Sequence, residues 1–452
     1  MEHRRKWFAS ILVLFLVLAG PRPAGAYSVL THEGMVDFLW ADSIQPLLLA
    51  RYPGLTAAQL REARAYAYGG CVIQDMGYYP FGKELLSDLL HYVRTGDFIR
   101  SLFRNAKTAD ETAFAIGALV HYYGDTIGHP DAVNKAVAAD FPDLAAKFGP
   151  NVNYAEGPRQ HVQAEFAFDV NEIVKHRLAP ERYMNRAGFD VPVALLGKAF
   201  YETYGLHLNK VMRQHRPSMK GYRFSVRKLL PTVAYAETLL YAKRMPPDPS
   251  GAEMDQFNAL VAKTAASERW DQYRTHPGFG THVIAGIIFL VPPFGKLGDL
   301  KIHPPDSAAE DSYVRSVLKT ADVLRQTLAA ASRSGNIPND DLDTGDHVYP
   351  GTYPLEDYAY ADLLHEMTLD PASPIPFGIK RDLVAYFSDL SKVKYLQGDK
   401  NKKRLAQVQD DLPKLSAIPT GVEEPEAPLL AQAQAEDTEK AKSQAAPAPS
   451  PH

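Results

Sequence analysis

Apolar residues recur at helical spacing along most of the chain. Residues three or four apart lie on one face of a helix, so this spacing is typical of helices that bury one side. Alternating patterns typical of strands, and hairpin turns, are scarce. We therefore predict an all-α fold. The clearest helical periodicity is found in residues 58–68, 161–177, 191–214, 228–243, 252–270 and 308–333.

Two more helices are indicated by local signals. Thr108 and Glu111 have the spacing of a capping box, which predicts that a helix begins there. Residues 84–95 form another predicted helix because their leucines follow a single stripe. That stripe contains Leu85, Leu86, Leu89, Leu90 and Val93.

Composition divides the chain into parts. The proline-rich residues 245–251 are the best internal boundary. They separate a helical bundle, residues 27–245, from a mostly helical extension of unknown role, residues 246–417. In residues 418–452 Pro, Ala, Gln and Glu dominate and large apolar residues nearly vanish, which predicts a disordered tail.

The N-terminus has the pattern of a secretory signal peptide, residues 1–26. Basic residues 4–6 precede an apolar run, residues 7–18, and the small residues 24–26 form a cleavage site. The apolar run is shorter than the roughly 20 residues that span a bilayer, although a retained anchor is the alternative. We expect a protein exported to the periplasm or the extracellular space, with Tyr27 as its first mature residue.

Charge and cysteine content limit the possible functions. The signal peptide contains four cations and one acid, so its removal changes the formal net charge from -4 to -7. An acidic chain has no broad attraction to nucleic acid. Its single cysteine, Cys71, cannot form an internal disulfide, so an exported chain must be held by its core or by metals. We interpret Cys71 as a small buried residue.

Metal-ligating residue types occur at helical spacing. His121 and Asp125 are four residues apart, as are His161 and Glu165, so each pair shares one helix face. The first pair continues the apolar stripe of its helix, and buried polar groups need partners. A His/carboxylate hydrogen bond within each pair would satisfy this need. With His129 there are five donors of the types that zinc takes, which favours a metal site.

The full set of such residues, in chain order, is Tyr27, His32, Asp75, His91, His121, Asp125, His129, His161 and Glu165. This order resembles the ligand series of the zinc-dependent phospholipase C family, over roughly residues 27–180. The related single-strand-specific zinc nucleases use a similar series. The resemblance implies a multi-helix bundle of the phospholipase C or nuclease type that binds up to three zinc ions.

The resemblance also distributes the ligands. It implies that the first ion is held by Asp75, His91, His121 and Asp125, the second by His129, His161 and Glu165, and the third by the Tyr27 backbone, His32 and a shared Asp125. Asp75 is in addition the candidate catalytic residue, which would orient or deprotonate the attacking water.

Two candidate ligands fit the pattern less well. Helical periodicity places His91 on the polar side of residues 84–95, where a surface histidine is the alternative. His129 follows Asp125 by four residues, whereas the familiar enzymes of the family have six. Because the residue before a proline disfavours helical geometry, we expect a turn at residues 128–130.

The predicted function follows from charge. A phosphodiester gains negative charge as water attacks, and zinc ions can bind its oxygens and activate the water. We favour a phospholipase C that releases a phosphorylated headgroup from a phospholipid, because Glu165 rather than an aspartate closes the last pair. The alternatives are a zinc nuclease on the same scaffold and a non-catalytic zinc-binding envelope protein. The favoured function involves no nucleic acid, and no obligate protein partner is evident.

Two segments of the extension have open roles. Residues 283–294 are strongly apolar and contain two prolines. They predict either a buried element or a loop in peripheral contact with a membrane. Four aspartates crowd residues 340–346, but this spacing fails the EF-hand template. We predict a solvated turn there.

Overall fold

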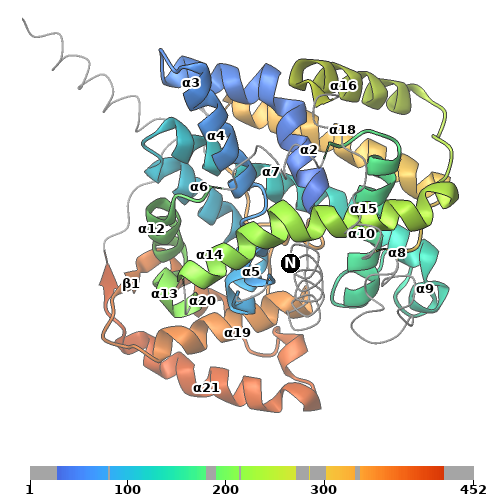
Figure 1. Ribbon diagram of the computed structural model, residues 1–452. Helices are drawn as coiled ribbons and strands as arrows, with labels where there is room; N and C mark the ends of the chain where they lie inside the picture. The colour runs from blue at the N-terminus through green and yellow to red at the C-terminus, as the bar shows by residue number, and fades with distance from the viewer. Residues whose placement is uncertain are drawn as a thin grey trace, which may run out of the picture.

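Helices make up most of the described part of the chain (Figure 1). The structure is a computed structural model, and it describes residues 28–79, 82–179, 190–212, 215–270, 285, 302–330 and 336–421. The first elements are α2 (Val29–Leu39), η1 (Trp40–Ile44), α3 (Gln45–Arg51), α4 (Ala57–Gly70), η2 (Gln74–Gly77), α5 (Glu84–Tyr92), α6 (Thr95–Asn105), α7 (Ala109–Gly128), η3 (His129–Val133), α8 (Asn134–Asp140), α9 (Pro142–Phe148) and α10 (Pro158–Val174).

The second half continues the helical architecture. Its elements are α12 (Val193–Tyr204), α13 (Leu208–Val211), α14 (His215–Phe224), η4 (Ser225–Leu229), α15 (Leu230–Tyr241), η5 (Ala242–Arg244), α16 (Ala252–Glu268), α18 (Ser307–Ala330), α19 (Pro354–Thr368), α20 (Phe377–Tyr386), η8 (Lys394–Leu396), η9 (Asp399–Asn401) and α21 (Lys402–Ala417). The strands β1 (Ile375–Pro376) and β2 (Thr420–Gly421) form one short parallel pair. The all-α prediction is therefore confirmed.

The predicted helical segments correspond to observed helices, with one division. The described part of the predicted segment 191–214 forms α12 and α13 rather than one helix, because α12 ends at Gly205. Gly205 has φ +66°, a left-handed conformation that glycine adopts without steric cost and that ends helices. The predicted capping box is present: Thr108 Oγ1 accepts from the Glu111 N–H at 3.2 Å, and a Glu111 oxygen accepts from the Thr108 N–H.

Helix α7 lies in the interior and packs closely along α4 (Figure 1). Two glycines permit this contact. A Cβ atom on Gly117 would lie 2.1 Å from the carbonyl oxygen of Ala67, and one on Gly70 would lie 2.1 Å from that of Phe114. Such distances are impossible for real side chains, so the two backbones touch only because both positions lack a Cβ.

The extension shares the core of the bundle. Helix α18 packs against α7 and α2, and α19 packs against α5 and α21. One cluster of buried apolar side chains runs from Val29 to Ile418. Residues 418–421, which composition assigned to the tail, belong to this fold, because Ile418 is buried and β2 pairs with β1. The domain boundary at residues 245–251 stays a prediction.

The prediction of a solvated turn at residues 340–346 is wrong. The side chains of Asp341 and Asp343 are 0% and 2% exposed. Asp341 Oδ1 accepts the N–H groups of Asp343 and Thr344, each at 2.8 Å. The Glu356 carboxyl is 1% exposed and is hydrogen-bonded to the Asp341 carboxyl. The sequence pattern did not reveal that α5 and α19 cover these carboxyls.

Several predictions lie outside the described residues. They concern the signal peptide with Tyr27, the apolar segment 283–294 apart from Ala285, and the tail after residue 421. Among the described helices, none combines the length and the apolar character that crossing a membrane requires.

Replacing Gly117 with alanine should destabilise the protein by about 1–3 kcal/mol, the usual cost of overpacking a core. Unfolding in urea measures this loss. Gly197→Ala in α12 is the matched control, because a Cβ there meets nothing within 4 Å. That change should stabilise the helix by about 0.5–1 kcal/mol. Equal effects of the two substitutions would contradict the close contact between α4 and α7.

Stability should also depend on the pH through Glu356. Burial raises the pKa of this carboxyl from 4.5 to about 8. The folded protein then keeps a proton that the unfolded chain releases, so the free energy of unfolding should fall as the pH rises from about 4.5 to about 8. Glu356→Gln should flatten this dependence in urea unfolding measured at several pH values. The same slope in both proteins would contradict the raised pKa.

Candidate metal centre

The first group of donors joins α2 to α7. His32, His121 and Asp125 are fully buried, and one ligand atom of each lies within 4.8 Å of the others. Asp125 Oδ1 lies 3.1 Å from Nε2 of His32, and its Oδ2 lies 3.0 Å from Nε2 of His121. The two imidazole rings stack with centroids 4.3 Å apart. The Asp125 carboxylate therefore bridges the two histidines.

The second group comprises Asp75, His91 and His121, from η2, α5 and α7. Asp75 Oδ1 lies 3.4 Å from Nε2 of His91 and 3.9 Å from Nε2 of His121. Asp125 also approaches, since its Oδ2 lies 3.7 Å from Nε2 of His91. His121 thus belongs to two groups.

The alternative of a surface histidine at position 91 is wrong. Its side chain is 1% exposed, because α5 packs against both η2 and α19. Helix α5 also ends at Tyr92 rather than at residue 95. The apolar stripe buries one side of α5. Contacts with η2 and α19 bury a second side, which carries His91.

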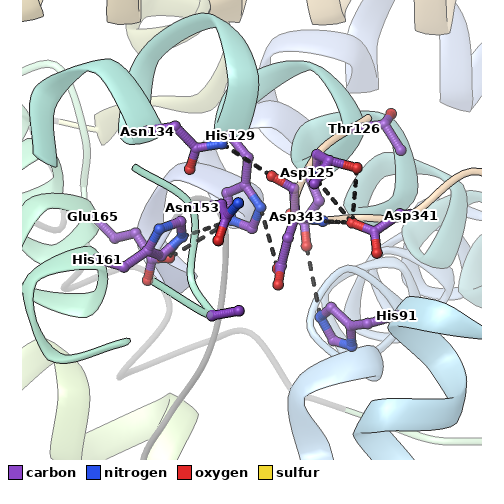
Figure 2. Close-up of polar contacts among 12 residues, drawn as sticks. His91, Asp125, Thr126, His129, Asn134, Asn153, His161, Glu165, Asp341 and Asp343 are labelled. Atoms are coloured by element: carbon purple, nitrogen blue, oxygen red, sulfur yellow. Dashed lines mark hydrogen bonds and ion pairs between the residues drawn. The ribbon is translucent and has the colours of Figure 1, made fainter. Parts of the chain in front are cut away.

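The third group comprises His129, His161 and Glu165, from η3 and α10 (Figure 2). Glu165 Oε1 lies 2.8 Å from Nε2 of His161 and 3.6 Å from Nε2 of His129. The two Nε2 atoms are 3.2 Å apart. All three side chains are buried.

The turn expected at residues 128–130 is absent. His129 has φ −60° and ψ −66°, and α7 continues directly into the π-helix η3. A π-helical turn is wider than an α-helical one, which relieves the clash that the Pro130 ring would cause in an α-helix. The widened turn carries His129 toward α10, and so compensates for its short spacing from Asp125.

Backbone carbonyls orient two of the imidazoles. Nδ1 of His121 lies 3.0 Å from the carbonyl oxygen of Cys71, which is buried as predicted. Nδ1 of His91 lies 2.7 Å from the carbonyl oxygen of Ser87. A ring that donates through Nδ1 keeps the lone pair of Nε2 for a metal. Both Nε2 atoms face the carboxylates.

The start of α2 is held by Asp169, one helical turn after Glu165 in α10. Its two carboxylate oxygens accept from the N–H groups of Leu30 and Thr31, each at 3.0 Å. The Thr31 hydroxyl donates to the same side chain at 2.6 Å. These bonds satisfy free N–H groups at the helix N-terminus. They fix the position of His32 relative to the third group.

Around Asp125 the pKa shifts of the carboxylate and of His91 favour the presence of positive charge. Burial opposes ionisation of Asp125, but His121 and His32 outweigh it and hold its pKa well below the ordinary value. Burial also opposes a proton on His91, yet the nearby Asp75 carboxylate outweighs it and raises the pKa of His91 to about 9. Burial lowers the pKa of His32, so the histidines around Asp125 differ in their preference for a proton.

In the third group the pKa shifts favour the neutral form of all three side chains. Burial, reinforced by the charges of Asp75 and Asp125, raises the pKa of Glu165 well above its ordinary value. Burial lowers the pKa of His129, and together with His129 lowers that of His161 strongly. Neutral imidazoles are the form that binds metals. A cation would also favour the ionised form of Glu165.

The donor set fits zinc. Nitrogen from histidine and oxygen from carboxylates are ligands that zinc takes. Among the described residues, several buried atoms that face these groups have no hydrogen-bond partner, and a metal ion would satisfy them. They are Nε2 of His91, Nε2 of His121, both carboxylate oxygens of Asp125 and Oε1 of Glu165. Three groups, each of at least three donors, are present in the described part of the chain.

The helical fold and the buried histidine and carboxylate groups are those of a protein that could bind metal ions. Residues 31–213 match the family described as zinc dependent phospholipase C. The match confirms the resemblance to this family over that part of the chain. Comparison with curated proteins found no match, and comparison with solved structures found none. The family and the three donor groups together indicate zinc binding.

One residue beside the site was missed by the sequence analysis. Asp343 Oδ1 lies 3.4 Å from Nδ1 of His129, on the side opposite to His161 and Glu165 (Figure 2). Asp343 belongs to the acidic segment that we interpreted as solvated. The crowding of aspartates was the available signal, but nothing in their spacing connects them with His129.

Loss of His121 should remove more bound zinc than loss of His161, because His121 belongs to two donor groups and His161 to one. Metal analysis of purified His121→Ala and His161→Ala measures this difference. The exposed His303 provides the control, and His303→Ala should keep the wild-type zinc content. Equal zinc contents in the two site variants would contradict the shared position of His121.

Proposed function

We propose that this protein is a zinc-dependent phospholipase C that hydrolyses a phospholipid and releases its phosphorylated headgroup. The observation that carries the proposal is the convergence of eight buried donors in the family-matched part of the chain. The proposed ligands are His32, Asp75, His91, His121, Asp125, His129, His161 and Glu165, with Tyr27 as a ninth through its backbone. They would hold up to three ions, distributed as the family resemblance implies.

Bound zinc would supply Lewis acidity toward the phosphate oxygens and would lower the pKa of the attacking water. The side chains of this chain have distinct tasks around it. Asp125 and Glu165 supply negative charge at the two ends of the donor set and keep their histidine partners in place. Asp75 Oδ1 faces His91 and His121 without a hydrogen-bond partner among the described residues. Asp75 is therefore the proposed residue that orients the attacking water and accepts its proton.

A phospholipid is favoured over nucleic acid as the substrate. The formal net charge of -4 gives the chain no general attraction to a polyanion. A neutral or zwitterionic headgroup presents a single phosphodiester, which the compact donor set can accommodate. Export through the N-terminal signal peptide, to the periplasm or beyond the cell, would place the protein where phospholipid is available, and remains part of this proposal.

The substrate class can be tested with three compounds: phosphatidylcholine, a soluble phosphocholine ester and single-stranded DNA. We expect the zinc-loaded protein to hydrolyse the first two, and Asp125→Asn to reduce the rate by at least about 100-fold, because it removes the charge between two histidines. Release of phosphocholine is the measurement. Truncation after Gly421 is the control. It keeps β2 and all of the proposed ligands, and should keep full activity.

Hydrolysis of DNA alone would favour the nuclease alternative. Zinc binding without hydrolysis of any of the three compounds would favour a non-catalytic zinc-binding protein. Full activity of Asp125→Asn would contradict the assignment of the site.

A further inference from the structure

The side chain of Asp343 is buried against the third donor group but lies outside the family match. Its Oδ1 lies 3.4 Å from Nδ1 of His129. Nε2 of the same ring faces His161 and Glu165 on the other side. The ring therefore lies between a carboxylate and the donor group (Figure 2). In metal sites a carboxylate on the remote nitrogen fixes the tautomer and orientation of a histidine ligand.

The second oxygen of Asp343 is also held. Oδ2 accepts from the hydroxyl of Tyr353 at 2.6 Å and from that of Tyr92 at 2.9 Å. The Tyr353 hydroxyl oxygen itself accepts from the N–H of Ala155 at 3.0 Å, which directs its hydrogen toward Asp343. The carboxylate thus has two donors on Oδ2 and keeps Oδ1 for the imidazole.

The backbone around Asp343 is fixed as well. Its carbonyl oxygen accepts from the side-chain amide of Asn134 at 3.1 Å, and the Leu342 N–H donates to the carbonyl oxygen of His91 at 3.1 Å. Gly345 has φ +73°, and a Cβ there would lie 2.4 Å from the carbonyl oxygen of Thr126. The segment therefore lies directly against the junction of α7 and η3, where His129 begins the π-helix.

From this geometry we infer that Asp343 is a positioning residue of the metal centre. Its Oδ1 lies 3.4 Å from Nδ1 of His129, a buried atom without a hydrogen-bond partner among the described residues. There it would accept the Nδ1 proton when Nε2 binds zinc, and so direct the lone pair of Nε2 toward His161 and Glu165. The extension after residue 245 then contributes to the centre itself, beyond its packing against the bundle. The inference rests on the zinc site proposed above, and it goes beyond it by assigning a role to a residue that the family match does not include.

Asp343→Asn in the full chain is the first test. The two tyrosine hydroxyls should hold the amide oxygen at the position of Oδ2, which turns the amide NH₂ toward Nδ1 of His129. The ring would then carry its proton on Nε2 and could not bind a metal through that atom. We expect an affinity for one zinc ion that is about 10- to 100-fold lower, measured by competition with a chromogenic chelator. The visible spectrum of the cobalt-substituted protein should change accordingly.

The matched control is Asp346→Asn, an exposed aspartate in the same segment. It should keep the wild-type zinc affinity and cobalt spectrum. The melting temperature of the metal-free proteins separates positioning from folding, since the near-isosteric Asp343→Asn should change it little. An unchanged zinc affinity and cobalt spectrum in Asp343→Asn would overturn the inference while leaving the proposed zinc site intact. Absence of zinc from the wild-type protein would overturn both.

A rescue experiment tests the proposed cause. Adding Tyr92→Phe and Tyr353→Phe to Asp343→Asn removes the donors that hold the amide, so the amide can rotate its oxygen toward His129. Zinc affinity should then recover in part, whereas a purely structural role predicts a further loss. If the variants do not fold, ¹⁵N NMR of the histidine rings in the zinc-loaded wild-type protein decides the question. We expect His129 to carry its proton on Nδ1, and a proton on Nε2 would overturn the inference.

Discussion

The close contact between α4 and α7 is the constraint on which the site depends. Because Gly70 and Gly117 lack side chains, the two backbones touch, and the carbonyl of Cys71 at the end of α4 reaches Nδ1 of His121. The chain then continues into η2, which brings Asp75 to the same imidazole. A larger separation of the helices would remove both contacts together. The distance between two helices thus sets the orientation of a histidine that belongs to two donor groups.

Buried charge is the second constraint, and it explains why the donors are grouped. Isolated carboxylates and imidazolium ions are costly in a core, so each must have a partner. In the first two groups Asp75 and Asp125 raise the pKa of His91 and His121, whereas burial lowers that of His32. In the third group burial lowers the pKa of His161 and raises that of Glu165. A bound cation there would favour the ionised form of Glu165 beside the neutral histidines. Metal binding would therefore contribute to the stability of the fold as well as to its chemistry.

The sequence predicted those features that depend on a single helix. The pairs at spacing four lie on buried faces of α7 and α10, and the capping box begins α7 as expected, because these properties follow from helix geometry alone. His91 and Asp343 could not be placed in this way. His91 is buried by η2 and α19 on the side that its own helix leaves polar. Asp343 is held by residues that lie 251 and 209 positions earlier in the chain, Tyr92 and Asn134. Burial of this kind depends on tertiary contacts, which periodicity does not encode.

The acidic segment, residues 340–346, also shows why a loop rather than a helix contacts His129. The π-helix η3 begins at His129 and Pro130 has no N–H, so the carbonyl of Thr126 cannot be satisfied by the usual helical bond to residue 130. Gly345 packs directly on that carbonyl, and its positive φ turns the chain at this point. A residue with a side chain at this position would place its Cβ atom 2.4 Å from the carbonyl oxygen of Thr126, which is too close. The irregular turn that brings His129 toward α10 therefore also creates the position where a glycine-containing loop can approach. Two residues before that glycine, the loop places a carboxylate against the ring.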